Sequence, residues 1–149
     1  MSTPTIRRAT REDLTAIVAL LADDDLGRTR EAPGDPCYAR AFDAIAADPN
    51  QFLAVVDDGG AVVGCFQLSF IPGLSLKGLW RGQIESVRIA ASRRGQGLGR
   101  VMIGWAIDES RRRGCGLVQL TMNKSRQNSH RFYESLGFEA THEGFKLVL

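Results

Sequence analysis

A glycine-rich, basic stretch, "SRRGQGLGR", occupies residues 92–100 and separates an apolar run from an amphipathic one. Glycine lets backbone N–H groups approach a ligand without interference from a Cβ atom. A helix that follows such a loop adds its N-terminal amides and the positive end of its dipole. The stretch therefore predicts a strand–loop–helix unit that cradles an anion, and phosphate is the anion that suits it best.

The length and composition suit a single domain. A chain of 149 residues can bury a sizeable core, and 44% hydrophobic with 24% charged residues is ordinary for a soluble protein. We therefore expect one domain over residues 1–149. The net charge of +2 is too small to indicate a nucleic-acid partner. No apolar run reaches membrane-spanning length and the first residues form no signal-peptide core, so no membrane partner is expected.

Three cysteines, Cys37, Cys65 and Cys115, are odd in number and widely spaced. Such spacing favours neither a disulfide framework nor a zinc site. We therefore predict a reducing, cytoplasmic compartment and no bound metal.

Apolar periodicity predicts a layered order of strands and helices. Gly and Pro clusters mark the loops between them. Strands are expected at 5–9, 79–90 and 117–122, a hairpin at 51–70, and one or two more strands within 138–149. Helices are expected at 10–24, 37–48, from the glycine loop to about 113, and at 125–137. The order β-α-α-β-β-β-α-β-α-β(-β) indicates an α+β (α/β layered) domain, a mixed sheet with helices on both faces.

Two common phosphate loops do not fit the stretch. A dinucleotide-binding loop needs G-x-G-x-x-G, but the sixth position counted from Gly95 is Arg100, and counted from Gly97 it is Met102. A P-loop ends in Gly-Lys-Ser or Gly-Lys-Thr, which the chain lacks.

A third pattern fits. Residues 94–99, "RGQGLG", have the form [QR]-x-x-G-x-[GA], and "HRFYESLGF" follows some 30 residues later. Together these motifs resemble the GNAT superfamily of acyl-CoA-dependent N-acyltransferases, most specifically over 83–113 and 117–138. The resemblance implies a mostly antiparallel sheet of six to seven strands. It also implies transfer of an acetyl group from acetyl-CoA to a primary amine, by direct attack in a ternary complex. A non-catalytic acetyl-CoA sensor or regulatory module is the alternative.

The resemblance also assigns the coenzyme site. It implies that backbone groups of Val87, Arg88 and Ile89 pair with the pantetheine arm. Relatives often carry an asparagine where this chain has Arg126, and an arginine could reach a phosphate there instead. The pyrophosphate would lie on the loop residues Arg94, Gly95, Gln96, Gly97, Leu98, Gly99 and Arg100.

The same resemblance gives catalytic candidates. Tyr133 lies where relatives supply a proton to the departing thiolate, and it would share a helical face with Arg126 and Ser129. An amphipathic core tyrosine is the competing interpretation. Glu85 is the candidate general base. Strand alternation would place its side chain on one face with Gln83, Val87 and Ile89. An exposed strand carboxylate is its competing interpretation, and water, His130 and His142 are alternative bases.

The acceptor amine is left open by the sequence. In such a fold its pocket would form from residues 22–36 and 70–82, and a small-molecule amine or a peptide amine would fit. The first segment is acidic and predicts attraction of a cationic amine, and the second offers an apolar wall. A homodimer also stays open. The residues concerned are Asp23, Asp24, Asp25, Glu31 and Asp35 in the first segment, and Phe70, Leu74, Leu76 and Trp80 in the second.

Overall fold

The computed structural model describes residues 3–149 and contains two compact units, Met1–Gln119 and Leu120–Leu149. Each unit is described by itself below, and a single domain over 1–149 stays a prediction. In the part of the chain that the structure describes, every helix is too short or too polar to cross a membrane.

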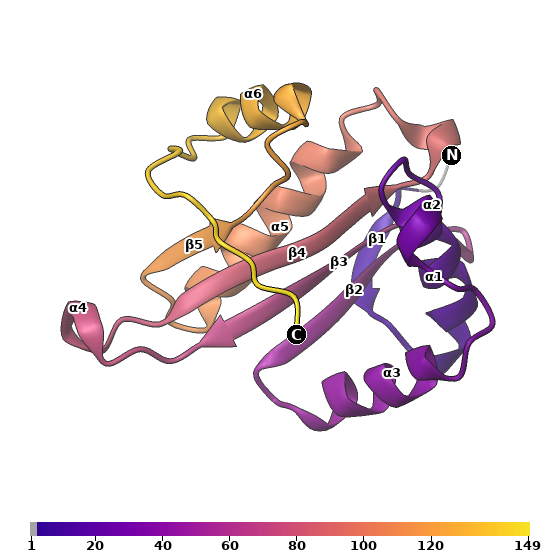
Figure 1. Cartoon of the computed structure of the whole chain (residues 1–149), viewed down its shortest axis with the longest axis horizontal. Coiled ribbons are helices and arrows are strands. Elements are labelled where there is room, and N and C mark those ends of the chain that lie inside the picture. Colours follow the sequence, from indigo (N-terminus) through magenta and orange to yellow (C-terminus); the bar gives the residue numbers. More distant parts are fainter. Residues whose placement is uncertain (1–2) are drawn as a thin grey trace. The chain divides into compact units, whose positions relative to one another are not determined.

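The first unit follows the predicted order of elements closely (Figure 1). Two short helices that the sequence pattern did not predict, α2 (Gly27–Arg30) and α4 (Ser75–Gly78), lie in the loops of this unit. Its helices are α1 (Leu14–Ala22), α2 (Gly27–Arg30), α3 (Cys37–Ala47), α4 (Ser75–Gly78) and α5 (Leu98–Arg112), with 3-10 turns at Arg11–Asp13 and Ala91–Arg93. Its strands are β1 (Thr5–Arg8), β2 (Gln51–Asp58), β3 (Ala61–Ile71), β4 (Arg81–Ile89) and β5 (Leu117–Leu120), the last of which ends at the unit boundary.

The strands form one sheet in the order β1-β2-β3-β4-β5, and the first four pair antiparallel. Gly116 N donates to Trp80 O at 2.9 Å, and Gln119 Nε2 donates to Gln83 Oε1 at 2.9 Å. Both contacts join residues 36 positions apart, as expected where β5 runs parallel to β4. The prediction of a mixed, mostly antiparallel sheet is confirmed.

The predicted strand number is wrong, because the sheet has five strands rather than six to seven. The second unit contains one helix, α6 (Gln127–Ser135), and residues 138–149 form no strand. An apolar alternation favours a strand, but a strand exists only where a neighbour accepts its backbone hydrogen bonds. No residue of 138–149 takes part in such a ladder in the described structure.

Helices cover both faces of the sheet, as predicted. Val55 and Cys65 point to one face and pack with Ile17 and Leu20 of α1. On the other face, Trp105 of α5 lies 5.2 Å from the ring of Phe52 and 5.9 Å from that of Phe66. Burial raises the pKa of the Cys65 thiol to about 12, so this group is a small apolar core residue.

The start of α1 is fixed to the sheet by a carboxylate. Asp13 Oδ2 accepts from the backbone N–H of Thr10 at 2.7 Å and from Arg7 Nη1 at 2.7 Å, while Arg7 Nε reaches Asp57 at 3.0 Å. Thr10 and Asp13 therefore form a capping box at the start of this helical segment. The Arg7 guanidinium, followed by the Thr10 amide, lowers the pKa of Asp13 from 3.8 to about 2.

This lowered pKa predicts acid sensitivity. The carboxylate of Asp13 stabilises the fold above its ordinary pKa, and the contribution is lost as the pH falls from about 4 towards 2. We expect Asp13→Asn to lower the free energy of unfolding by about 1–2 kcal/mol at pH 7. Urea unfolding at pH 7 and pH 3 should show that the difference in unfolding free energy between wild type and Asp13→Asn becomes smaller at pH 3. The control Asp25→Asn, whose carboxylate is 99% exposed, should change little. A gap that widens on acidification would contradict the assignment.

Candidate functional site

Strand β4 carries a bulge in its second half. Gln67 of β3 lies opposite Glu85, but Cys65 lies opposite Arg88, so β4 has one residue more than β3 in this stretch. Ser86 adopts φ +56, a left-handed conformation that costs a non-glycine residue about 1–3 kcal/mol. Cys65 Sγ contacts the Ser86 carbonyl at 3.8 Å. The bulge therefore leaves backbone groups near Ser86 and Val87 outside the regular ladder.

The predicted alternation along β4, which placed Glu85 and Ile89 on one face, is wrong because of this bulge. Glu85 lies opposite Gln67 and Arg88 lies opposite Cys65, so both belong to the α1 face of the sheet. Ile89 lies opposite Gly64, whose missing Cβ would contact Met102 of α5. Glu85 and Ile89 thus occupy opposite faces, because the extra residue inverts the two-residue period.

The glycine-rich stretch forms the strand–loop–helix unit that the sequence predicts. Gly95 and Gly97 adopt φ +76 and +80, and a Cβ at either position would meet no atom within 4 Å. Gly97 is the N-cap of α5, so Leu98, Gly99 and Arg100 form its first turn. The first amides of a helix have no partner within that helix and favour an anion. The loop thus presents backbone N–H donors beside open space.

The arginines around this loop have different partners. Arg93 pairs with Asp58 at the turn between β2 and β3, which ties the loop to the sheet. Arg94 Nε donates to Ile89 O at 3.3 Å, and its Nη2 donates to Asp23 O at 3.4 Å. Because both acceptors of Arg94 are neutral carbonyls, its positive charge is available to an anion.

An ion pair between Asp24 and Arg88 joins the corner between α1 and α2 to β4. The Asp24 carboxylate accepts from Gly27 N and lies 2.9 Å from Arg88 Nε, with 14% and 17% of the two side chains exposed. A Cβ on Gly27 would lie 1.9 Å from Leu21 O, so the corner requires glycine. The sequence interpretation placed Asp24 on an acidic rim and missed this pairing. The D-x-x-G spacing was the local signal for the cap.

Glu85 is exposed on β4 and belongs to a chain of amide hydrogen bonds. Gln83 Nε2 donates to Glu85 Oε1 at 2.9 Å, and Gln119 Nε2 donates to Gln83 Oε1 at 2.9 Å. On the same face, Gln51 Oε1 accepts from Gln67 and Ser69, each at 2.9 Å. The chain through Gln83 fixes the orientation of the Glu85 carboxylate. Sequence reasoning missed Gln119, although an amide within the apolar run "LVQLTM" was a signal.

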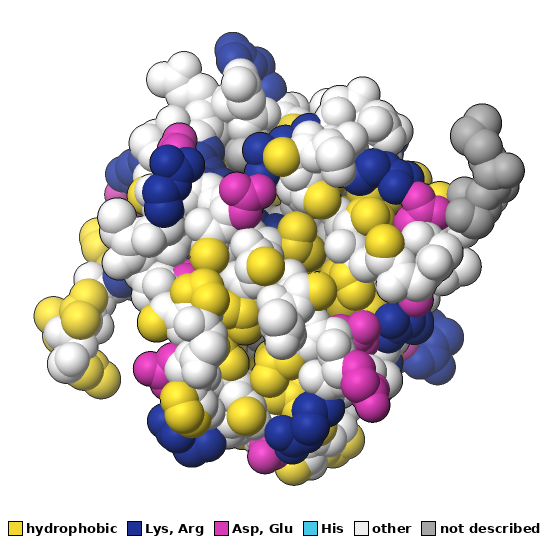
Figure 2. All heavy atoms as spheres, turned by 90° about the vertical axis from the view of Figure 1, so that its right-hand side faces the viewer, with side chains coloured by type: hydrophobic (Ala, Val, Ile, Leu, Met, Phe, Trp, Pro, Cys, Tyr) yellow, Lys and Arg dark blue, Asp and Glu magenta, His cyan; other side chains and the backbone are white. Residues whose placement is uncertain are grey.

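The acidic residues of the predicted acceptor segment are largely engaged. Asp25 pairs with Arg28 at 3.3 Å, and Glu31 accepts from the Tyr38 hydroxyl at 2.9 Å. Asp35 accepts from Cys37 N at 2.8 Å, which lowers its pKa. Figure 2, which views the side of the molecule that carries α1 to α3, shows acidic and basic side chains interspersed around apolar patches. This arrangement weakens the predicted preference for a cationic amine.

The second acceptor segment divides into buried and exposed residues. Phe70 is only 3% exposed and packs 4.1 Å beneath the Arg113 guanidinium, so it does not form a pocket wall. By contrast, Leu74 is 96% exposed, Leu76 63% and Trp80 37%. The exposed apolar part of this segment is therefore the loop around α4.

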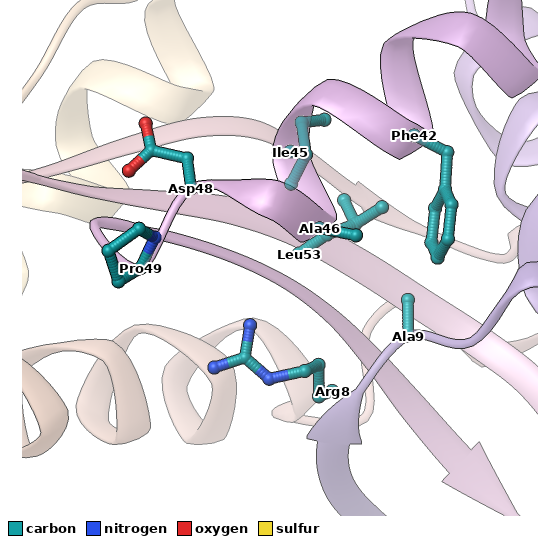
Figure 3. A pocket seen from close by; sticks show the side chains of 8 residues that line it. All are labelled: Arg8, Ala9, Phe42, Ile45, Ala46, Asp48, Pro49 and Leu53. Carbon is teal, nitrogen blue, oxygen red and sulfur yellow. The ribbon is translucent and has the colours of Figure 1, made fainter.

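A hollow of about 230 Å³ lies between α3 and the start of β2 (Figure 3). Its lining contains none of the predicted site residues. Arg8 at its edge holds its guanidinium 4.2 Å from the centre of the Phe52 ring. The lining residues are Arg8, Ala9, Phe42, Ile45, Ala46, Asp48, Pro49 and Leu53.

The second unit contains the other candidates. Tyr133 on α6 is half-buried, and its ring lies 5.1 Å from Phe132 and 5.8 Å from Phe138. Ser129 precedes it by one helical turn, but Arg126 is the N-cap, with φ −92 and ψ 72, and so lies outside the helix. His130 contacts Glu134 at 2.8 Å. Glu85, residues 87–89 and residues 94–100 thus all belong to the first unit, whereas Arg126 and Tyr133 belong to the second.

Comparisons with known proteins match nearly the whole chain. The model of the acetyltransferase (GNAT) family matches residues 15–138. An aminoalkylphosphonate N-acetyltransferase from Salmonella typhimurium is 29% identical over 144 residues, which cover 97% of this chain and 90% of that protein. Among solved structures, a transcriptional regulator from Bacillus halodurans C-125 is 47% identical with a TM-score of 0.95, covering 99% of this chain and 100% of that one. An acetyltransferase from Trypanosoma brucei is 28% identical with a TM-score of 0.82, covering 99% and 100%.

Proposed function

The chain belongs to the GNAT acetyltransferase family, and we propose that it transfers an acetyl group from acetyl-CoA to a primary amine by direct attack in a ternary complex. It is an acyl-CoA-dependent acetyltransferase, and acetyl-CoA is the acyl donor that such enzymes use. One observation carries the proposal. An open loop with two positive-φ glycines lies directly between a bulged strand and a helix N-terminus.

The coenzyme would be held mainly by backbone groups. The amides from Gly95 to Arg100, together with the Arg94 guanidinium, are suited to the pyrophosphate. Val87, Arg88 and Ile89 would offer backbone partners to the pantetheine arm, and the bulge leaves the groups near Val87 outside the ladder. Arg126 is proposed as a further phosphate contact.

The proposed reaction needs three functional groups. Glu85 accepts a proton from the acceptor amine, whose nitrogen attacks the thioester carbonyl carbon. The N–H near Val87 donates to the oxygen that becomes negative. As the new C–N bond forms and the C–S bond breaks, the Tyr133 hydroxyl gives its proton to the departing sulfur. Gln83 holds Glu85 in place, as the 2.9 Å hydrogen bond supports.

Tyr133→Phe tests the acid. The substitution removes the hydroxyl but keeps the ring contacts with Phe132 and Phe138. We expect turnover to fall by about 10-fold or more with acetyl-CoA affinity nearly unchanged, because the hydroxyl acts mainly in the transition state. Steady-state kinetics and coenzyme titration measure the two quantities. The control Phe132→Leu should lower thermal stability and leave turnover nearly intact. Normal turnover in Tyr133→Phe would show that Tyr133 contributes packing and not the proton.

An amine panel tests the function itself. Release of free thiol from acetyl-CoA should accelerate with some members of a set containing aminoalkylphosphonates, amino sugars, polyamines and lysine peptides. The first class is included because a relative is named for it. We propose that the acceptor is a small-molecule or peptide amine and that the protein is cytoplasmic. Thiol release that no amine accelerates would contradict the proposal.

A second candidate role is acetyl-CoA sensing or regulation of a partner. The observation that favours it is the 47% identity to a protein described as a transcriptional regulator. In that case acetyl-CoA should raise the melting temperature by mass action, while every amine leaves thiol release unchanged. The same panel therefore separates the two roles.

A further inference from the structure

A row of uncharged polar side chains crosses the α1 face of the sheet. Gln51 of β2 lies opposite Ser69 of β3, and Ser69 lies opposite Gln83 of β4. Beside this row, Gln67 of β3 lies opposite Glu85 of β4. Alternate residues of a strand share a face, so these side chains continue the face that carries the core beneath α1. The apolar core of this face is therefore followed by a polar surface that includes Glu85.

Hydrogen bonds orient the amide of Gln67. Its Nε2 donates to Gln51 Oε1 at 2.9 Å, and Ser69 Oγ donates to the same oxygen at 2.9 Å. Ser69 is only 6% exposed, so this anchor is part of the sheet interior, whereas Gln67 is half-buried. The contact with Gln51 engages one N–H of Gln67 and leaves its second N–H and its carbonyl oxygen to hydrogen bond with a ligand.

Gln67 is the cross-strand neighbour of the proposed general base. Residues directly opposite each other on antiparallel strands have Cβ atoms about 4.5–5.5 Å apart, and Gln67 and Glu85 are such a pair. An amine whose nitrogen hydrogen bonds to the Glu85 carboxylate therefore places the substituents on its next one or two carbons within reach of the Gln67 amide.

The charges on this face disfavour a charged substituent at that place. A phosphonate or carboxylate group would need a cation beside Glu85, but Arg88, which lies on this face, already pairs with Asp24 at 2.9 Å and is 17% exposed. The side chains that adjoin Glu85 in the sheet, Gln67 and Gln83, are neutral amides. An amide both donates and accepts hydrogen bonds, and so does a hydroxyl group, which makes a hydroxyl the complementary substituent.

We propose that the acceptor is a 1,2- or 1,3-amino alcohol, whose uncharged hydroxyl group hydrogen bonds to Gln67 while its nitrogen contacts Glu85. This inference rests on the proposed function and narrows the acceptor from primary amines in general to one chemical class. Gln67 determines the specificity, and Gln51 orients it through the 2.9 Å hydrogen bond.

Two matched amines measure this specificity. The amines trans-2-aminocyclohexanol and cyclohexylamine share one ring and differ by one hydroxyl group. We expect kcat/KM, measured by thiol release, to favour the amino alcohol, and Gln67→Met to reduce this preference by about 10-fold, the effect of one lost hydrogen bond. Methionine keeps the length of the side chain and removes both of its hydrogen-bonding groups. Because wild type and variant meet the same two amines, the difference in basicity between the amines cancels.

The control Gln119→Met alters the other amide chain on this face. Gln119 donates to Gln83 and so supports Glu85 rather than Gln67. It should lower the rates with both amines alike and keep the preference for the amino alcohol. A ratio of two rates measured on one sample does not depend on the folded fraction of that sample, so a destabilised variant still decides the question.

Calorimetric titration with both amines, in the presence of coenzyme A, measures the same preference without turnover. Tighter binding of the amino alcohol with no thiol release would contradict the proposed function and support this inference. An equal preference in wild type and Gln67→Met, or faster thiol release with 2-aminoethylphosphonate than with the amino alcohol, would overturn the inference and leave the function standing. An amino alcohol that neither binds nor reacts would also overturn it.

Discussion

Glu85→Gln should lower turnover by about 10²-fold or more at neutral pH, the loss typical of a removed general base. The amide keeps the size of the side chain and can still hydrogen bond to Gln83, so the position of the residue should change little. The loss should shrink at high pH, where the free amine is abundant and needs no base. Rates measured from pH 6 to 9 with a saturating acceptor test this.

The control for this substitution is another exposed carboxylate. Asp108→Asn on α5, where the side chain is 79% exposed and pairs with Arg111 three residues later, should leave the rates unchanged. If Glu85→Gln turns over normally across the whole range, the proton goes to water or to another residue. Glu85 would then be an exposed strand carboxylate that orders the amides beside it.

Gly97→Val should lower the affinity for acetyl-CoA by about 10²-fold or more. Valine is strained at φ +80, and its side chain would fill the open space beside the first amides of α5. Losing two hydrogen bonds to a charged group, each contributing about 1.5–3 kcal/mol, accounts for a change of this size. Calorimetric titration with acetyl-CoA measures it directly.

Gly114→Val separates this effect from backbone strain alone. Gly114 has nearly the same conformation, φ +83, and equally open surroundings, but it lies just after the other end of α5. Both variants should lose thermal stability to a similar extent, and only Gly97→Val should lose the coenzyme. Equal affinities of wild type and Gly97→Val for acetyl-CoA would contradict the assignment of this loop to the coenzyme site.

Local signals predicted the strand–loop–helix conformation around Gly95 and Gly97. The positive φ of Gly95 and Gly97 and the start of α5 depend on the glycines themselves and on the apolar spacing after them. The capping box of Thr10 and Asp13 is equally local. In such places the residues that determine the conformation are neighbours in the sequence, so the pattern is sufficient.

The candidate site was predicted less completely because parts of it depend on tertiary contacts. Counting alternate residues along β4 assumes a regular strand, and the bulge at Ser86 leaves no local signal, since serine is not a residue that favours φ +56. Arg88 therefore lies on the face of Glu85, and Ile89 does not. The pairing of Asp24 with Arg88 joins residues 64 positions apart, which no spacing rule could have indicated.

For the residues after α6, the sequence pattern predicted strands that the structure does not contain. Their alternation predicted one or two strands, but residues 138–149 form none, because a strand needs a partner that the sequence does not specify. Counting apolar runs therefore predicted six to seven strands, where the described sheet has five.

The ion pair between Asp24 and Arg88 separates the anchored corner of the first unit from the exposed loop that follows it. Since the corner at Asp24 and Gly27 is anchored to the bulged strand, the chain beyond it, from Arg28 to Pro36, can change length or composition without moving β4. Under the proposed function, substitutions in this loop would change the acceptor preference without moving the proposed coenzyme loop. Swapping residues 28–36 between relatives should therefore transfer substrate choice far more readily than transplanting any segment that includes Asp24.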